Sequence, residues 1–421
     1  MRNILSTKSF FIFLLKSASE ITNPSANSFK KAPQLAQKQH NLHVLHRVET
    51  QTKSHVVNPQ REPFVRRVEP IWTCPFVTIT LECPMKHNLR FTTKIPYSGN
   101  GEIMAKVMSN QRKKITVIGA GFVGSTTAHW AAMKELGDVV LLDINEGSAK
   151  GKSLDLAQSG PIEMFDAKIT GTSNYEDIAD SDVVILTAGM PRKPGMSRDE
   201  LVGINAKIVK DCCEGIKKYA PNSVVIVVCN PMDVMAVYAK QILGFPRERV
   251  LGMGGCLDSA RFRTFIAEEL KVSVRDVTGI VIGNHGDAMV PMPRLATVGG
   301  MPLTDMLSSE KIAAISTRTK QAGAEIGAHL KTGSAYYAPS RGAVEMAEAI
   351  LKDQKRILPV AVELKGEYGI NDGSMVGVPC RLGEKGMEGV IEIKMNAEEK
   401  VEFAKSVDAV RALVAILKTV Q

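Results

Sequence analysis

Long apolar segments are missing from this sequence, and no run approaches the roughly 18 residues that a membrane-spanning helix requires. An integral membrane protein is therefore excluded. Cysteines are few, seven among 421 residues, and none forms a Cys-x-x-Cys pair. An odd number without paired spacing argues against a disulfide scaffold or a structural zinc site and favours a reducing compartment. A chain of this length is too long for one core, so two domains are expected.

Acidic residues are scarce near the N-terminus. Residues 1–107 contain 15 lysines and arginines, six glutamates and no aspartate, which accounts for the whole formal net charge of +9. The remaining residues carry 38 basic and 38 acidic side chains. The basic character of the chain therefore gives no indication of what its larger part binds.

Residues 1–107 also lack sustained helical or strand periodicity, and eight prolines are scattered through them. Their apolar residues come in short bursts, so the segment is predicted to be a disordered extension. Upstream sequence translated ahead of a true start at Met108 would produce the same pattern. Residues 1–19 contain three basic residues, several serines and no acid, and they are also consistent with an organellar transit peptide. A nucleic-acid-binding arm is disfavoured because the charges are dispersed and are not clustered with aromatic residues.

The pattern changes abruptly at Lys113. A β-branched run, Ile115–Ile118, leads into a glycine motif, a helical stretch follows to about Leu136, and a second apolar run ends at Asp143. This G-x-G-x-x-G sequence in a strand–helix–strand context is typical of dinucleotide binding. The first glycine permits a tight turn, the second lets the backbone approach a pyrophosphate, and the third lets the helix pack against the strand. The motif consists of Gly119, Ala120, Gly121, Phe122, Val123 and Gly124.

Asp143 lies 19 residues after Gly124, at the end of the second predicted strand. A carboxylate there would accept hydrogen bonds from both adenosine ribose hydroxyls and would repel a 2′-phosphate, which favours NAD over NADP. Three further apolar runs follow at the spacing of a doubly wound fold: Asp182–Ala188, Val224–Cys229 and Val250–Met253. The sequence therefore predicts an α/β protein whose Rossmann doubly wound parallel sheet spans residues 108–257.

Residues 258–421 are predicted to form an α+β substrate-binding domain. Two helices are expected in it, at Ser308–Leu330 and Ala343–Leu351, followed by three strands at Ile357–Leu364, Met375–Cys380 and Val390–Lys394. A C-terminal amphipathic helix should close the domain and turn one apolar stripe to the core. The stripe consists of Val401, Ala404, Val407, Val410, Leu413 and Leu417.

Three polar features have ordinary structural explanations when each is taken alone. The charged segment 190–198 could be a solvated loop, Asp258 and Arg261 could form an exposed ion pair within one helix, and His285 could cap a strand end. Taken together, however, the features make the chain from Lys113 to Gln421 resemble the lactate/malate dehydrogenase superfamily. The resemblance is strongest to the lactate-dehydrogenase-like malate dehydrogenases of bacteria. It rests on five motifs in register: GAGFVG, PRKPGMSR, CNP, LDSAR and GNHGD.

The resemblance implies NAD-dependent, reversible oxidation of (S)-malate to oxaloacetate. It assigns His285 as the proton acceptor and Asp258 as the carboxylate that orients it. Arg261 is expected to bind the C1 carboxylate, Arg198 to polarise the reacting oxygen and Arg192 to bind the distal carboxylate. No metal site is expected, because the histidines after residue 107 show no ligand spacing with cysteine or acidic residues.

The resemblance also implies contacts beyond the glycine motif and Asp143. Asn230 is expected to contact both the substrate and the nicotinamide ribose, Asn205 to contact NAD, and Val228 and Cys229 to offer backbone groups. A dimer or tetramer of identical chains in the cytoplasm is expected, or in an organellar matrix if residues 1–19 are a transit peptide, without nucleic-acid or membrane partners. The alternatives are a lactate dehydrogenase and a non-catalytic NAD-binding sensor, although a sensor would have no need of His285 and its partners.

Overall fold

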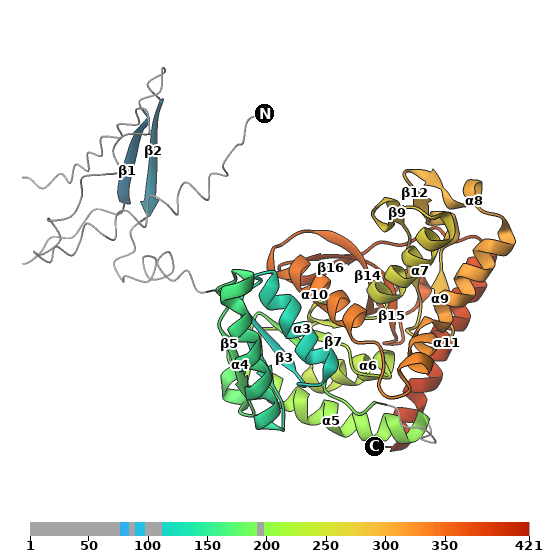
Figure 1. Ribbon diagram of the computed structural model, residues 1–421, viewed down its shortest axis with the longest axis horizontal. Coiled ribbons are helices and arrows are strands. Elements are labelled where there is room, and N and C mark those ends of the chain that lie inside the picture. The colour runs from blue at the N-terminus through green and yellow to red at the C-terminus, as the bar shows by residue number, and fades with distance from the viewer. Residues whose placement is uncertain (1–75, 84–88, 97–111, 192–197, 421) are drawn as a thin grey trace, which may run out of the picture. The chain divides into compact units, whose positions relative to one another are not determined.

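The computed structural model describes residues 76–83, 89–96, 112–191 and 198–420, which belong to two compact units, 1–110 and 111–421 (Figure 1). Within the first unit, β1 (Phe76–Cys83) and β2 (Leu89–Pro96) pair as an antiparallel hairpin. The prediction of a disordered extension did not anticipate these strands. Their signal is the alternation in Thr78-Ile-Thr-Leu81, which is short and stands outside any longer pattern. The rest of that prediction lies outside the described residues.

The second unit is built on a sheet whose strand order is β16-β15-β14-β8-β7-β6-β3-β4-β5. Six of these strands are parallel. When they are numbered 1 to 6 in chain order, their order across the sheet is 3-2-1-4-5-6, which is that of a doubly wound nucleotide-binding sheet. The predicted Rossmann fold is confirmed. The six strands are β3 (Lys114–Ile118), β4 (Asp138–Leu142), β5 (Ile169–Thr172), β6 (Val183–Leu186), β7 (Val224–Val227) and β8 (Val250–Gly252).

Helices cover both faces of this sheet, so its strands are apolar at successive positions. In β6, Val183 and Ile185 belong to the core beneath α3, whereas Val184 and Leu186 belong to the core beneath α5 and α6. All four residues are fully buried, as expected for parallel strands. The connecting helices are α3 (Phe122–Met133), α4 (Glu146–Glu163), α5 (Arg198–Tyr219) and α6 (Met232–Leu243).

The predicted second domain continues the same sheet. Ala361 of β14 (Arg356–Glu363) pairs antiparallel with Gly252 of β8, and β15 (Met375–Gly383) and β16 (Gly386–Val390) extend the sheet as a meander. A separate small core forms between α7 (Gly255–Leu270) and α9 (Ser309–Leu330). The remaining elements are β9 (Val277–Thr278), β10 (Val281–Ile282), β11 (Val290–Pro291), β12 (Thr297–Val298), β13 (Met301–Pro302), α8 (Leu303–Met306), α10 (Tyr337–Leu351) and α11 (Ala397–Val420).

Two predictions in this part were wrong in detail. The strand expected at Val390–Lys394 lies earlier, because β16 begins at Gly386 after a two-residue turn and already ends at Val390. The left-handed φ of +91° at Gly386 makes that turn possible. In α11, the predicted Val401 and Ala404 are exposed, whereas the predicted Val407, Val410 and Leu417 are buried together with Phe403 and Ser406. No helix among the described residues is both long and apolar enough to cross a membrane.

Candidate active site

Most of the predicted site residues lie at the carboxyl ends of the parallel strands. The glycine motif follows β3, Asp143 follows β4, Asn230 follows β7, and the helix that carries Asp258 follows β8. In open parallel sheets this edge is where ligands bind, in the crevice where the strand order reverses. Here the reversal occurs between β3 and β6, because the chain proceeds from β3 towards β5 and then returns to β6.

The glycine motif has the shape that a dinucleotide pyrophosphate requires. Gly119 has a φ of +102°, and a Cβ on Gly124 would lie 1.7 Å from the carbonyl oxygen of Gly119. A Cβ on Gly121 would instead meet no atom within 4 Å, so the backbone there is open. Gly121 is the N-cap of α3, and neither a side-chain cap nor an acidic residue occupies the first turn. The N–H groups of α3 are therefore available to phosphate oxygens.

Asp143 is fixed beside this motif by two backbone groups. Its Oδ2 accepts a hydrogen bond from the N–H of Ala120 at 2.6 Å, and its Oδ1 accepts one from the N–H of Asn145 at 2.8 Å. Each carboxylate oxygen retains a further lone pair that a ribose hydroxyl could use. Lys152 of α4 donates a hydrogen bond to the carbonyl oxygen of Ala120, so both backbone polar groups of Ala120 are bonded to side chains. Lys152 was not among the predicted site residues, and its only signal in the sequence is its place on the helix that follows Asp143.

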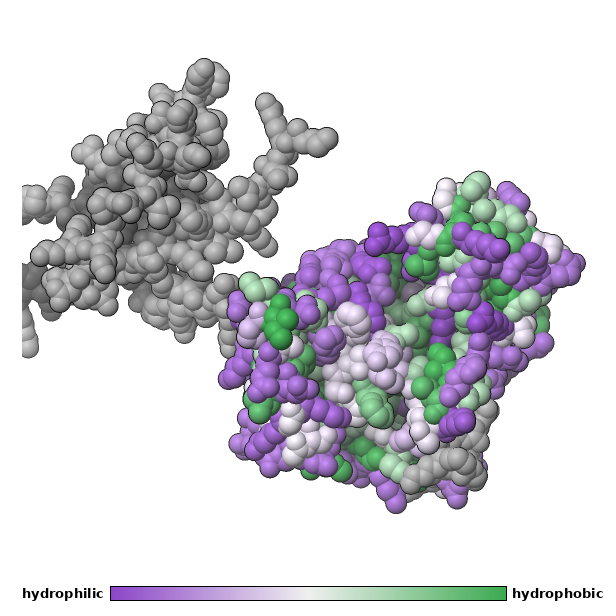
Figure 2. Space-filling view, in the orientation of Figure 1, coloured by the Kyte–Doolittle hydropathy of each residue, from purple (hydrophilic) through white to green (hydrophobic). Residues whose placement is uncertain are grey.

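The segment 336–340 also supports the glycine motif. Ser340 of α10 is fully buried, and its hydroxyl donates to the carbonyl oxygen of Val123 at 2.7 Å. The exposed ring of Phe122 stacks on Tyr336 with 5.3 Å between centroids, and Tyr336 contacts Tyr337. Pale and green residues gather near α3 and α10 in the space-filling view (Figure 2). No local sequence pattern indicates that this distant segment contacts the glycine motif.

His285, Asp258 and Arg261 form one hydrogen-bonded group. The Nδ1 atom of His285 lies 2.8 Å from Oδ2 of Asp258, and Nη1 of Arg261 lies 3.2 Å from Oδ1 of the same carboxylate. The three side chains are 16%, 2% and 12% exposed, respectively. Asp258 and Arg261 are therefore not an exposed ion pair on a helix surface. Because Asp258 is acceptor-only, it keeps the Nδ1 proton of His285 in place and leaves Nε2 to exchange a proton.

A second carboxyl group approaches His285 from α6. The Oδ2 atom of Asp233 accepts a hydrogen bond from the backbone N–H of His285 at 2.9 Å. Burial raises the pKa of Asp233 to about 6, although the charge and the N–H of His285 oppose the rise. Burial alone would lower the pKa of His285, but the charge and hydrogen bond of Asp258 and the charge of Asp233 raise it above the usual 6.5. Asp233 was not among the predicted site residues.

The two predicted asparagines differ in exposure. Asn230 is exposed at the end of β7, where a substrate or cofactor could reach it. Asn205 is fully buried, and the partners of its side chain among the described residues are backbone groups, those of Met190 and Asn230. The expected contact of Asn205 with NAD stays a prediction. Val228 and Cys229 are buried at the strand end, and the N–H of Val228 is already bonded to Leu186.

The remaining two predicted residues belong to the loop after β6. Arg192 lies outside the described residues. Arg198 is the first residue of α5, and its side chain is not among those described. The structure therefore places the start of the loop, at Met190 and Pro191, and its end, at the beginning of α5.

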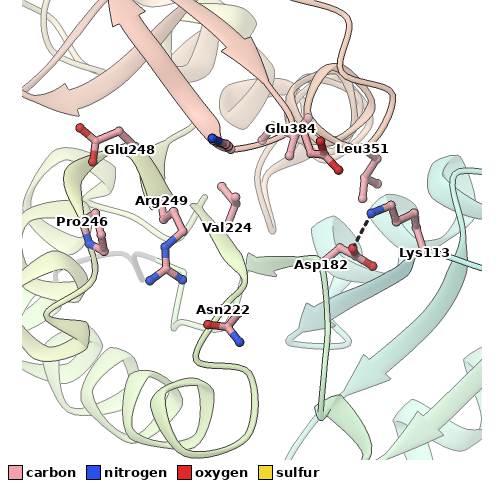
Figure 3. A pocket seen from close by; sticks show the side chains of 11 residues that line it. Lys113, Asp182, Asn222, Val224, Pro246, Glu248, Arg249, Leu351 and Glu384 are labelled. Carbon is pink, nitrogen blue, oxygen red and sulfur yellow. Dashed lines mark hydrogen bonds and ion pairs between the residues drawn. The ribbon is translucent and has the colours of Figure 1, made fainter. Parts of the chain in front are cut away.

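A cavity of about 450 Å³ opens at the opposite, amino-terminal edge of the sheet (Figure 3). Lys113 and Asp182, which precede β3 and β6, form an ion pair of 2.9 Å there, and the close-up marks it with a dashed line. Arg249, before β8, bonds to the carbonyl oxygens of Pro221 and Ser223. These contacts occupy Lys113, Asp182 and Arg249, and none of the predicted site residues lines the cavity.

Comparison with known proteins agrees with this geometry. Residues 113–252 match the family model of the lactate/malate dehydrogenase NAD-binding domain, and residues 256–419 match that of the lactate/malate dehydrogenase α/β C-terminal domain. The chain belongs to the lactate/malate dehydrogenase family. As a member of it, the chain has an NAD-binding domain, which contains the glycine motif and Asp143.

Individual members of the family resemble this chain closely. It is 56% identical to a malate dehydrogenase of Heliobacterium modesticaldum over 305 residues, which cover 72% of this chain and 98% of the relative. The crystal structure of Cryptosporidium parvum malate dehydrogenase matches with a TM-score of 0.72 and 46% identity, and covers 73% of this chain and 99% of that one. A lactate dehydrogenase of the same organism, complexed with lactic acid and NAD, matches with a TM-score of 0.71, 42% identity and coverage of 73% and 98%.

Proposed function

We propose that this family member is an NAD-dependent malate dehydrogenase that interconverts (S)-malate and oxaloacetate. The observation that carries the proposal is the buried group of His285, Asp258 and Arg261 beside a nucleotide-binding strand edge. Curated relatives at 55–56% identity, from Heliobacterium modesticaldum and a Roseiflexus species, are named malate dehydrogenases and support it. When bound, NAD supplies the hydride acceptor for malate and, as NADH, the hydride donor for oxaloacetate.

The cofactor would be held by groups that already have the required form. The open backbone at Gly121 and the uncapped first turn of α3 suit the pyrophosphate. Asp143 suits the adenosine ribose, because Ala120 and Asn145 hold its carboxylate in place without using all its lone pairs. We further propose that Asn230, at the exposed strand end, contacts the nicotinamide ribose and the substrate.

His285 would act as the general base in malate oxidation and as the general acid in oxaloacetate reduction. Its Nε2 takes the proton of the C2 hydroxyl in one direction and returns it to the C2 oxygen in the other. Asp258 fixes the ring and stabilises the imidazolium form, since the 2.8 Å bond becomes charge-assisted on both sides when the ring is protonated. Turnover therefore needs a neutral His285 for malate and a protonated His285 for oxaloacetate.

Arg261 would bind the C1 carboxylate of the substrate. One of its nitrogens is bonded to Asp258, and its Nε is buried with no partner among the described residues. An unsatisfied buried guanidinium donor is costly, and a planar carboxylate is the group that satisfies two such donors at once. Arg198, at the start of α5, is proposed to polarise the reacting carbonyl oxygen.

Arg192 is proposed to select the dicarboxylate, because the carboxylate distal to the reacting carbon needs a cation other than Arg198 and Arg261. The resemblance assigns this role to Arg192, where lactate dehydrogenases have glutamine. The deciding measurement is kcat/KM for oxaloacetate and for pyruvate with NADH, at one pH and salt concentration. Wild-type preference for oxaloacetate supports the proposal, whereas preference for pyruvate would identify a lactate dehydrogenase instead.

The variant Arg192→Gln makes the same test at residue level. Leaving a desolvated carboxylate opposite a neutral amide costs about 2–5 kcal/mol, so kcat/KM for oxaloacetate should fall roughly 30- to several-thousand-fold. Activity towards pyruvate should be kept. Lys193→Gln removes the neighbouring positive charge from the same loop and should leave the ratio of the two substrates nearly unchanged. An unchanged ratio in Arg192→Gln would assign the dicarboxylate specificity to another residue.

We also propose that residues 108–257 bind NAD and that residues 258–421 contribute the substrate site. The two family matches support this division, because one ends at residue 252 and the other begins at residue 256.

We propose in addition that the protein is a homo-oligomer and acts in the cytoplasm. Three large apolar side chains at α4 support self-association, since Leu154, Ile162 and Met164 are 62%, 80% and 83% exposed. Light scattering coupled to gel filtration tests it, because a single-chain mass of 45.7 kDa would contradict it.

A further inference from the structure

His285 lies between two carboxyl groups from different helices. Asp258 of α7 contacts its ring at 2.8 Å, and Asp233 of α6 contacts its backbone N–H at 2.9 Å. The second carboxyl group is 2% exposed, and its Oδ1 has no hydrogen-bond partner among the described residues. The mechanism above uses Asp258 and leaves Asp233 without a role.

A carboxylate is an expensive way to bind a single N–H group. A buried, partly unsatisfied carboxylate costs folding free energy, whereas an asparagine amide of the same shape would accept the His285 N–H without carrying a charge. Holding the backbone of His285 therefore accounts for an acceptor at position 233 but does not account for an ionisable one. The charge must have its effect on the other charged groups of the site.

The described part of the chain places three other ionisable side chains around Asp233. Among the described residues, the ionisable side chains that act on Asp233 are His285 and Asp258, and Arg261 of α7 acts in turn on His285. Met232 and Gly254, which also pack against this corner, carry no charge. With both aspartates ionised, the four side chains sum to zero when His285 is an imidazolium and to −1 when it is neutral. Because these side chains are buried or nearly so, the form of this group with no net charge is favoured.

We propose that Asp233 is a positioning residue that fixes the His285 backbone and whose negative charge holds the proton on the His285 imidazolium, thereby setting the pH range in which each direction of the reaction runs. The proposal rests on the proposed dehydrogenase function. Removing the charge while keeping the acceptor would leave a net charge of +1 with the imidazolium and zero with the neutral ring. The neutral ring would then be favoured, and oxaloacetate reduction would lose its proton donor at a lower pH.

The test is Asp233→Asn in the full-length chain, with kcat/KM measured from pH 5 to 10 for oxaloacetate and for malate. At alkaline pH, where oxaloacetate reduction declines, kcat/KM for oxaloacetate should fall below its plateau value in both proteins. At a given pH this fall should be about 3- to 10-fold larger in Asp233→Asn than in wild type. At acid pH, where malate oxidation declines, the fall of kcat/KM for malate below its plateau value should be smaller in Asp233→Asn than in wild type by a similar factor. The plateau values should change much less, because the His285 N–H keeps its acceptor.

Asp182→Asn is the matched control. Asp182 also accepts a backbone hydrogen bond, from Lys114 at 2.8 Å, but it lies at the opposite edge of the sheet (Figure 3). This variant should leave both pH profiles in place. If Asp233→Asn lowers stability or the plateau rates while the profiles stay where they are in wild type, Asp233 is a structural acceptor only, and the proposal is overturned.

Two further measurements keep the test decisive. If Asp233→Asn does not fold, Asp233→Ser carries the same expectation, since its hydroxyl also accepts and has no charge. The imidazole nitrogens of ¹⁵N-histidine-labelled wild type can be titrated directly, with His285 assigned by comparison with His285→Asn. The pKa of His285 should lie above the usual 6.5 of a histidine. A His285 that loses its proton below pH 6.5 would overturn the inference. An enzyme that reduced neither oxaloacetate nor pyruvate would contradict only the proposed function.

Discussion

Asn205 binds both backbone polar groups of Met190 through its carboxamide. Its Oδ1 accepts from the Met190 N–H at 2.7 Å, and its Nδ2 donates to the Met190 carbonyl oxygen at 3.1 Å and to the Asn230 carbonyl oxygen at 2.6 Å. One fully buried side chain thus ties the first residues of the loop after β6 to the end of β7. Asn205 thus holds the backbone of Met190 and Asn230 in place.

We predict that Asn205→Ala lowers stability and activity together. The substitution leaves three backbone groups without their partner, which should lower the free energy of unfolding by about 1–3 kcal/mol. It should also lower kcat/KM for oxaloacetate, because the loop and Asn230 lose a common anchor. Urea unfolding and steady-state kinetics measure the two effects, with the exposed Asn222→Ala as control. A higher KM for NADH with unchanged stability would instead indicate that Asn205 contacts the cofactor directly.

Replacing Asp143 should alter the choice of cofactor. Asp143→Ser removes the ribose contacts and the repulsion of a 2′-phosphate, and a single hydroxyl cannot also hold both Ala120 and Asn145. KM for NADH should rise, and the ratio of kcat/KM for NADH to that for NADPH should fall. Glu146→Ser, which removes a nearby acid paired with Lys150, should leave the ratio unchanged. A wild-type enzyme that uses NADPH as well as NADH would contradict the assigned role of Asp143.

Replacing His285 should separate catalysis from cofactor binding. His285→Asn removes the group that exchanges the proton, and general acid–base catalysis contributes roughly 10²- to 10⁴-fold, so kcat should fall by that factor. The dissociation constant of NADH, measured by fluorescence titration, should stay nearly the same. His329→Asn, on the exposed surface of α9, serves as the control. Full turnover in His285→Asn would leave His285 with only a structural role.

The sequence predicted the residues whose signal is local and missed those whose role depends on distant partners. The glycine motif and Asp143 lie within one strand–helix–strand unit, so their spacing is informative. Asp258 and His285 were assigned through motif resemblance, since nothing local indicates that residues 27 positions apart share a hydrogen bond. Ser340 bonds to Val123 across 217 residues, and only the fold reveals that contact. Asp233 could have been suspected as an acid in the first turn of a helix whose other residues are mostly apolar.

A final prediction concerns the ion pair that anchors the segment after β14. Glu367 accepts two hydrogen bonds from Arg247, at 3.1 and 2.9 Å, and one from the backbone N–H of Lys365 at 2.6 Å. The Arg247 hydrogen bonds lower the pKa of Glu367 to about 2, although partial burial opposes the change. Arg247 also donates to the carbonyl oxygen of Glu363, so the pair joins the start of β8 to the end of β14.

Because the pKa of Glu367 is lower in the folded chain than the usual 4.5, the pair should stabilise the protein fully above about pH 4.5 and progressively less as the pH falls towards 2. Glu367→Gln should therefore lower the free energy of unfolding by about 1–3 kcal/mol at pH 7. The difference from wild type should shrink when urea unfolding is repeated between pH 4.5 and 2.5. The exposed pair of Glu146 and Lys150 provides the control, since Glu146→Gln should change stability by less than about 0.5 kcal/mol. A difference for Glu367→Gln that is absent at pH 7, or that does not shrink with acid, would show that the charge of Glu367 contributes nothing to folding.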